Sequence, residues 1–111
     1  MLYARKTRFF WILALTGQHR VIWNRPLTVT RGILNTTLVH PQEVLRLAIH
    51  VNAAASVAVH NHPSGETSPS AEDRTVTEQL VAAGRLLDIP LLDLVIIGGA
   101  AYMSYGETGL M

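Results

Sequence analysis

The sequence predicts a single α/β domain in which two main helices cover a mixed β-sheet. Its 111 residues suffice for one hydrophobic core but not for two. About half of the residues (49%) are apolar and 15% are charged, which is typical of a folded domain and unlike a disordered chain. Segments rich in β-branched and aromatic residues stand at both ends, and a third lies between two segments of helical periodicity. We therefore expect one domain over residues 1–111 with the order β-β-β-α-β-α-β-β.

The first third of the chain is expected to form strands. Aromatic and branched residues predict a strand over Arg8–Thr16, and the polar segment TGQHR predicts a turn into a second strand, Val21–Asn24. Pro26 then interrupts pairing because proline has no N–H to donate. A short third strand, Leu27–Thr30, is expected before the next glycine.

The remaining elements alternate between helix and strand. A proline at the first helical position and apolar residues at helical spacing predict a helix over residues 41–53. Ser56–His60 is short and apolar, as expected of a central strand, and a loop rich in Pro and Gly follows it. A second amphipathic helix is expected over residues 69–87, followed by strands at Leu91–Ile97 and Tyr102–Tyr105.

Two histidines stand one residue apart where the expected central strand ends. Side chains two residues apart on a strand point to the same side, so His60 and His62 can aim both imidazoles at one point. Asp73, in the first turn of the next helix, can supply a carboxylate oxygen as a third ligand. Three protein ligands and an open position for water are typical of a catalytic zinc site. The other histidines are expected to be ordinary polar side chains: His19, His40 and His50.

Asp73 also has a structural interpretation. Ser70 to Asp73 match the capping-box pattern S-x-x-[DE], in which both side chains satisfy backbone N–H groups at a helix start. Spacing alone does not decide between a metal ligand and a helix cap, and both interpretations remain open.

Charge and composition restrict the partners and the location. No cysteine is present, so a metal must be held by imidazole and carboxylate, and the composition fits a reducing cytoplasm. The apolar run Phe9–Leu15 is far shorter than a membrane span, so no membrane partner is expected. No acidic residue precedes Glu43, which leaves either a solvated basic face or a patch for nucleic acid or an acidic protein. The basic residues of this part are Arg5, Lys6, Arg8, Arg20, Arg25 and Arg31.

The histidine segment resembles a known family signature. HNHPSG followed by SPSAED is similar to the His-x-His-x7-Ser-x2-Asp pattern of the JAB1/MPN (JAMM) metalloproteases. The flanking segments RGILNTTLVHPQEVLRLAI and LVAAGRLLDIPLLDLVIIG resemble the RadC-like branch of that superfamily, so the resemblance covers nearly the whole chain. It implies a cytidine-deaminase-like layering and a Zn²⁺ ion bound by His60, His62 and Asp73. It also implies a catalytic role for Ser70, which would donate a hydrogen bond to the zinc-bound water or to an oxyanion.

One position departs from the pattern of the family. Its enzymes use a glutamate on an early strand as general base, and the corresponding position here falls at about Arg8. The start of the chain has diverged, catalysis has been lost, or another carboxylate substitutes. Glu43 is the nearest carboxylate in sequence, although its HPQEV context favours a structural role in a helix start. Leu94 is a second departure, because many relatives have histidine there.

Two functions follow from the resemblance. The first is a zinc metallopeptidase or isopeptidase acting on peptide or protein substrates, weakened by the missing glutamate. The alternative is a catalytically silent module that binds DNA or protein, since the family carries a traditional association with DNA repair. No nucleic-acid motif with interleaved aromatic residues is present, and the sequence does not indicate an oligomeric state.

Overall fold

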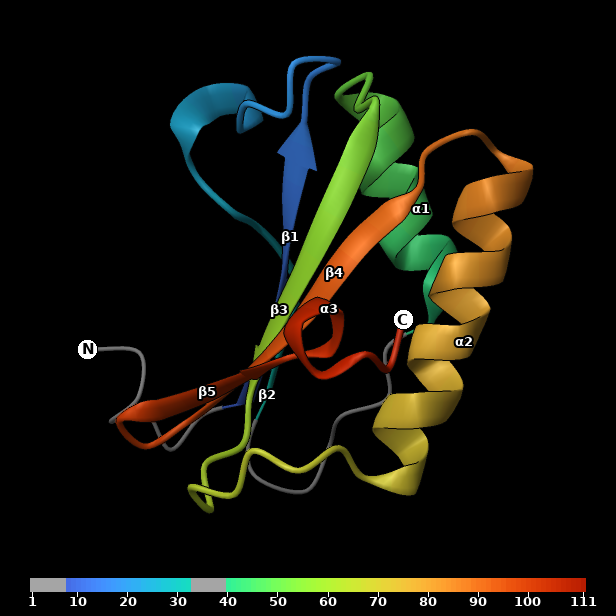
Figure 1. Ribbon diagram of the computed structural model, residues 1–111. Coiled ribbons are helices and arrows are strands. Elements are labelled where there is room, and N and C mark those ends of the chain that lie inside the picture. Colours follow the sequence, from blue (N-terminus) through green and yellow to red (C-terminus); the bar gives the residue numbers. More distant parts are fainter. Residues whose placement is uncertain (1–7, 33–39) are drawn as a thin grey trace.

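The computed structural model describes residues 8–32 and 40–111, which form a five-stranded mixed sheet with helices packed on it (Figure 1). The strands are β1 (Arg8–Leu15), β2 (Leu27–Gly32), β3 (Ala55–Asn61), β4 (Leu91–Gly98) and β5 (Ala101–Ser104). The helices are α1 (Pro41–His50), α2 (Ala71–Leu86) and the short α3 (Tyr105–Thr108). This architecture confirms the predicted fold class.

The sheet has the strand order β2-β1-β3-β4-β5. β1 pairs antiparallel with both β2 and β3, and β5 pairs antiparallel with β4. β3 and β4 are parallel, and α2 forms the crossover between them, as a parallel pair requires. The sequence predicts the histidine pair at the carboxyl end of β3, and β3 is the central strand of the sheet.

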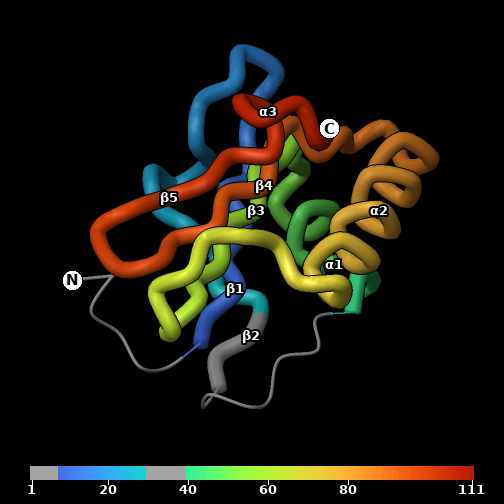
Figure 2. Tube along the Cα trace, turned by 60° about the horizontal axis from the view of Figure 1, so that its bottom comes forward, coloured from blue at the N-terminus to red at the C-terminus, as the bar shows by residue number. Residues whose placement is uncertain are grey.

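Both main helices lie on the same face of the sheet, as Figures 1 and 2 show from two directions. Alternate residues of β1 point to this face, so Phe10 and Ile12 enter the core while their neighbours point away. Val44 of α1 and Leu80 of α2 pack into the same cluster. His60 pairs with Phe10 and therefore also projects toward the helices. The fully buried large side chains are Ile12, Val44, Leu80, Leu94 and Ile96.

The predicted second strand, Val21–Asn24, is wrong. Val21 forms only an isolated bridge with Leu15, and Ile22–Asn24 is a turn of 3₁₀ helix. Trp23 and Asn24 both have positive φ (63° and 53°), a left-handed conformation that cannot continue an extended strand. The observed strand order therefore contains one strand fewer at the start than predicted, and the third predicted strand becomes β2.

The closing strand begins and ends one residue earlier than predicted. β5 ends at Ser104, and Tyr105 begins α3 instead of ending the strand. The Ser104 hydroxyl accepts a hydrogen bond from the N–H of Glu107 and so caps this helix, and it donates to the carboxylate of Asp93. Ser104 is therefore the residue at which β5 ends and the cap from which α3 begins.

A glycine at the end of β4 allows the loop after β3 to approach closely. A Cβ on Gly98 would lie 2.6 Å from the carbonyl oxygen of Gly65. Two backbone hydrogen bonds hold that loop in place: the His62 N–H donates to Ile97 O (2.8 Å), and the Gly65 N–H donates to His62 O (2.9 Å). The loop can hold the backbone of His62 in this position because Gly98, as a glycine, has no side chain.

We expect Gly98→Ala to destabilise the protein by about 1–3 kcal/mol, because the methyl group meets backbone that has little freedom to move. Denaturant unfolding measures the difference. Gly17→Ala is the matched control: no atom lies within 4 Å of the added Cβ, and the change is expected to stay within about 0.5 kcal/mol. Equal effects of the two substitutions would contradict the close approach.

Candidate metal centre

The two predicted histidines converge at the carboxyl end of β3. His60 is the penultimate residue of β3, and His62 follows directly after the strand. Their rings are 5.0 Å apart, nearly perpendicular, and both side chains are largely buried. Phe10 on β1 stacks on the His60 ring at 5.7 Å, which fixes the orientation of that imidazole. The expectation that both side chains share one side of the strand is confirmed.

A backbone carbonyl selects the tautomer of His62. Nδ1 lies 2.7 Å from the carbonyl oxygen of Glu66, and because a carbonyl only accepts, Nδ1 carries a proton and donates it. Nε2 is then directed at Asp73, 2.9 Å from Oδ2. This carbonyl contact is the one that commonly orients a metal-binding imidazole, since it leaves the Nε2 lone pair for the metal.

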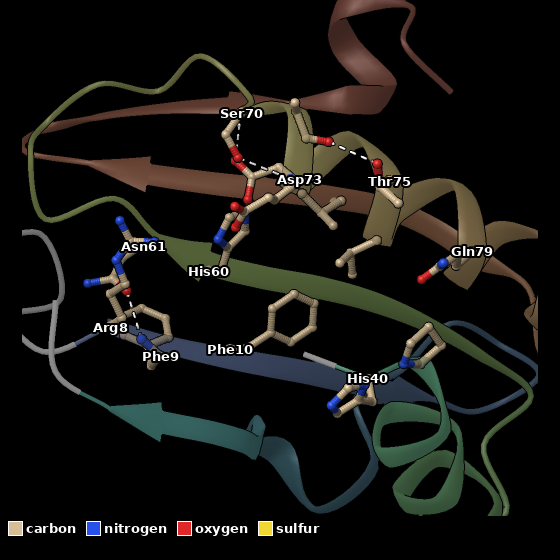
Figure 3. Close-up of a pocket in the computed structure, with 15 residues that line it drawn as sticks. Arg8, Phe9, Phe10, His40, His60, Asn61, Ser70, Asp73, Thr75 and Gln79 are labelled. Carbon is tan, nitrogen blue, oxygen red and sulfur yellow. Dashed lines mark hydrogen bonds and ion pairs between the residues drawn. The ribbon is translucent and has the colours of Figure 1, made fainter. Parts of the chain in front are cut away.

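Asp73 serves as helix cap and as site residue together. Its Oδ2 accepts a hydrogen bond from the Ser70 N–H (2.8 Å), and its own N–H donates to Ser70 Oγ (3.0 Å), which completes the capping box (Figure 3). The same carboxylate faces both histidines, with Oδ1 3.5 Å from His60 Nε2 and Oδ2 2.9 Å from His62 Nε2. The two interpretations left open by the sequence are therefore compatible, and the cap holds the carboxylate in place for the histidines.

The three side chains differ in their protonation. Burial lowers the pKa of His60 to about 4, with the charges of His62 and Arg8 adding to this effect, so its imidazole is neutral at physiological pH. The hydrogen bond to Asp73 raises the pKa of His62 above its usual value. Burial opposes ionisation of Asp73, but the hydrogen bond from His62, the proximity of His60 and the two Ser70 contacts outweigh it and lower its pKa.

These donors fit a divalent cation. One ligand atom from each of the three residues lies within 4.8 Å of the others, and no other group of this kind occurs in residues 8–32 and 40–111. Two imidazole nitrogens and one carboxylate oxygen match the ligands that catalytic zinc sites use. A neutral His60 does not have to be deprotonated from an imidazolium before it binds a cation. A cation between His62 Nε2 and Asp73 would replace the proton that they share.

A pocket of about 460 Å³ lies beside the three donors, between β1, β3 and the first turns of α1 and α2 (Figure 3). We call it the site pocket. Phe10, Val76 and Leu94 provide apolar walls, and Arg8, Ser70 and Glu72 provide polar groups. Of the predicted site residues, His60, Ser70 and Asp73 line it directly.

The two residues that depart from the family pattern, Arg8 and Leu94, both line the site pocket. Arg8 lines the site pocket, as the proposed alignment predicts for the position of the missing glutamate. Leu94 is 1% exposed, lines the same pocket and belongs to the hydrophobic core. Glu43 lies in the first turn of α1 and is not part of the pocket lining, in agreement with a structural role.

Sequence reasoning missed two titratable residues of the site pocket, Glu72 and His40. Glu72 lies in the first turn of α2 next to Asp73, and His40 immediately precedes α1. The position of Glu72 directly before the predicted ligand is a signal that could have indicated it. His40 has no such signal, because only packing of α1 against the sheet brings it to the pocket.

The basic residues of the first third do not share one location. Arg8 lines the site pocket, whereas Arg20 and Arg25 are exposed in the segment between β1 and β2. Arg5 and Lys6 lie outside the described residues, as does the side chain of Arg31. Nucleic-acid binding through this part of the chain stays a prediction.

Comparisons with known proteins give the family of the chain. The model of the RadC-like JAB domain matches residues 1–110. The chain belongs to the RadC-like JAB family. Among curated relatives, a UPF0758 protein of Trichlorobacter lovleyi is 43% identical over 106 residues, which are 96% of this chain and 45% of the relative. Two UPF0758 proteins of Escherichia coli K12, YkfG and YeeS, are 45% and 46% identical over 102 residues.

The family resemblance read from the sequence is thereby confirmed. The two Escherichia coli alignments cover 92% of this chain, and 63% of YkfG and 68% of YeeS. Several relatives of this RadC-like JAB domain are longer, and the chain spans about half the length (45%) of the Trichlorobacter lovleyi protein. Within residues 8–32 and 40–111, no helix combines the length and apolar character that a membrane crossing requires.

Two substitutions of Asp73 separate its two roles. Asp73→Asn keeps an oxygen that can accept from the Ser70 N–H but removes the charge, so we expect near-normal stability and a large loss of metal affinity. Asp73→Ala removes both functions and is expected to cost about 0.5–2 kcal/mol of stability as well. Denaturant unfolding and metal titration measure the two effects. Unchanged metal binding in Asp73→Asn would reduce the residue to a helix cap.

Proposed function

We propose that this RadC-like JAB domain is a zinc-binding hydrolase domain that cleaves peptide or isopeptide bonds. The proposal is supported chiefly by one observation, the convergence of His60, His62 and Asp73 beside a pocket. Membership of the family is consistent with it. A bound zinc ion would polarise the scissile carbonyl and make its water acidic enough to supply hydroxide near neutral pH.

The residues of the chain have separate tasks in this proposal. His60 and His62 would bind the ion through Nε2, where the ion would take the place of the proton between His62 and Asp73, and the Glu66 carbonyl holds the other His62 proton on Nδ1. Asp73 supplies the negative charge and stays ionised because its pKa is lowered. Ser70 Oγ accepts from the Asp73 N–H, which leaves its own proton available for an oxyanion that forms at the scissile carbonyl.

Proton transfer is the weak part of the site. Hydrolysis takes a proton from water and delivers one to the leaving amine, and a guanidinium cannot perform this transfer because it stays protonated. Arg8 occupies the pocket wall on β1, where its charge adds to the lowering of the pKa of His60 and opposes, without reversing, the rise in the pKa of His62. Glu72 is the second carboxylate of the pocket lining besides Asp73. Because Arg8 occupies the position of the family's general base, we expect slow turnover of the peptide substrate.

Arg8 also favours a second function for the same site. A domain that binds metal and a peptide segment without cleaving it needs the three ligands and the pocket, but no base. Such a binding module would share every structural feature described above. The two functions differ only in whether the bound peptide is hydrolysed.

Metal analysis tests the centre of the proposal. We expect purified protein to carry about one zinc per chain and His62→Ala to carry almost none, because a three-ligand site loses most of its metal affinity when one ligand is removed. His50→Ala is the matched control, since His50 is exposed at the end of α1 and belongs to no metal cluster of the described residues. Equal zinc content in both variants, or no zinc in the wild type after loading, would overturn the proposal.

Substitution of Arg8 tests the missing base. Arg8→Glu places a carboxylate on the site side of β1. The substrate is a C-terminally amidated peptide that is cleaved at an internal bond. We expect its hydrolysis to rise roughly tenfold or more, since a well-placed base contributes roughly 10²–10⁴-fold. Arg8→Gln is the control, because it removes the positive charge without adding a base. A wild-type rate equal to that of Arg8→Glu would show that the site has no such defect.

A further inference from the structure

We propose that the site pocket recognises the free carboxylate of a peptide C-terminus, and that Arg8 is the residue that binds it. This inference deepens the proposed function, on which it rests for the reaction, by naming the substrate class. The binding itself is a property of Arg8 and the pocket walls, so it can be measured separately from metal binding and from hydrolysis.

The position of Arg8 follows from the pairing of β1 with β3. Arg8 lies two residues before Phe10, and Phe10 pairs with His60, so the Arg8 side chain leaves the sheet on the same face as the histidine. A side-chain contact fastens the two strands at this end, since Asn61 Oδ1 accepts from the Phe9 N–H at 2.8 Å. Figure 3 shows Arg8 next to Asn61 at one end of the pocket, with Gln79 toward the other end.

The charges around the pocket favour an anion. Asp73 is already engaged by His62 and Ser70, and it would be neutralised further by a metal. His60 and His62 bring no negative charge, and Glu72 is exposed at the pocket wall and therefore well solvated. Once a divalent cation is bound, the centre is net positive and Arg8 adds to that charge. This positive potential would attract an anionic ligand.

The shape and polarity of the pocket favour a carboxylate that belongs to an amino-acid residue. A guanidinium presents a planar fork that matches a carboxylate with two parallel hydrogen bonds. Apolar walls from Phe10, Val76 and Leu94 stand in the same pocket and suit a hydrophobic side chain. The last residue of a peptide supplies both parts together, whereas inorganic phosphate or acetate supplies only the anion.

Arg8 has enough donors for this task. Its guanidinium carries five N–H groups, so contacts with the protein and with an incoming carboxylate are compatible. It lies at the start of β1, where Arg8 pairs with Gly32 of β2, and pairing with β3 begins two residues later at Phe10. The side chain therefore projects from a fixed point of the sheet, which lowers the entropy cost of binding.

Calorimetric titration with one peptide in two forms tests the inference. The probes are N-acetyl-Ala-Leu with a free C-terminal carboxylate and the same dipeptide as its C-terminal amide, added to zinc-loaded protein. We expect the acid to bind on the order of ten- to a hundredfold more tightly than the amide, as for a charge-assisted hydrogen-bonded pair. Arg8→Gln should abolish this preference, and Arg8→Lys should restore it only in part because it lacks the fork.

Arg20→Gln is the matched control, because Arg20 is exposed in the turn after β1 and does not line the pocket. It removes the same charge and should leave the acid preference intact. An acid preference that survives in Arg8→Gln, or that disappears equally in Arg20→Gln, would overturn the assignment to Arg8. Acetate binding as tightly as the peptide acid would overturn the peptide C-terminus as the source of the carboxylate.

The metal-free His62→Ala variant separates this inference from the proposed function. An acid preference that is lost together with the metal, but kept in zinc-loaded Arg8→Gln, would place the carboxylate on the ion and overturn the role of Arg8. An acid preference that depends on Arg8 and persists in metal-free protein supports the inference. That last result would stand even if zinc analysis of the wild type refuted the hydrolase proposal.

Discussion

The arrangement of the site depends on the contact between Asp73 at the start of α2 and His62 after β3, at 2.9 Å. His62 begins the loop of residues 62–70 and Asp73 lies in the first turn of the helix after it, so their contact closes this loop. The capping box turns Asp73 toward the histidines, and the backbone bond from His62 to Ile97 fixes the other partner. Because both partners are held independently, a cation that enters between them finds donors already in place, which reduces the cost of ordering them.

Burial of His60 carries an energetic consequence for the same contact. The buried imidazole of His60 beside Phe10 is neutral, and its low pKa reflects the cost of protonating it in this position. His62 and Asp73 instead share a proton in a contact that is only partly buried. The centre therefore contains one donor kept neutral by burial and one pair whose shared proton a metal would have to replace. Metal binding in the proposed function would then depend on pH through His62 more than through His60.

Much of the fold was readable from the sequence because hydrophobic periodicity reports burial, and burial organises this sheet. The histidine pair was predictable from strand alternation alone, and Asp73 from the capping pattern. Val21–Asn24 was misread because the left-handed conformations of Trp23 and Asn24 leave no mark in a run of apolar residues. The placement of both main helices on one face, and the approach of His40 to the pocket, depend on packing between distant segments that periodicity does not report.

Arg8 shows why a family fold does not determine the chemistry of a site. The β1–β3 register places residue 8 on the wall of the site pocket whatever its side chain, so one substitution changes the chemistry there without changing the fold. A carboxylate at this position would draw protons from water and repel anionic ligands, whereas a guanidinium does neither. In the proposed function, Arg8 takes the place of a proton-transfer group and offers a positive charge to an anionic ligand instead. The proposed combination of three metal ligands with Arg8 describes a site that would bind its ligand but turn it over slowly.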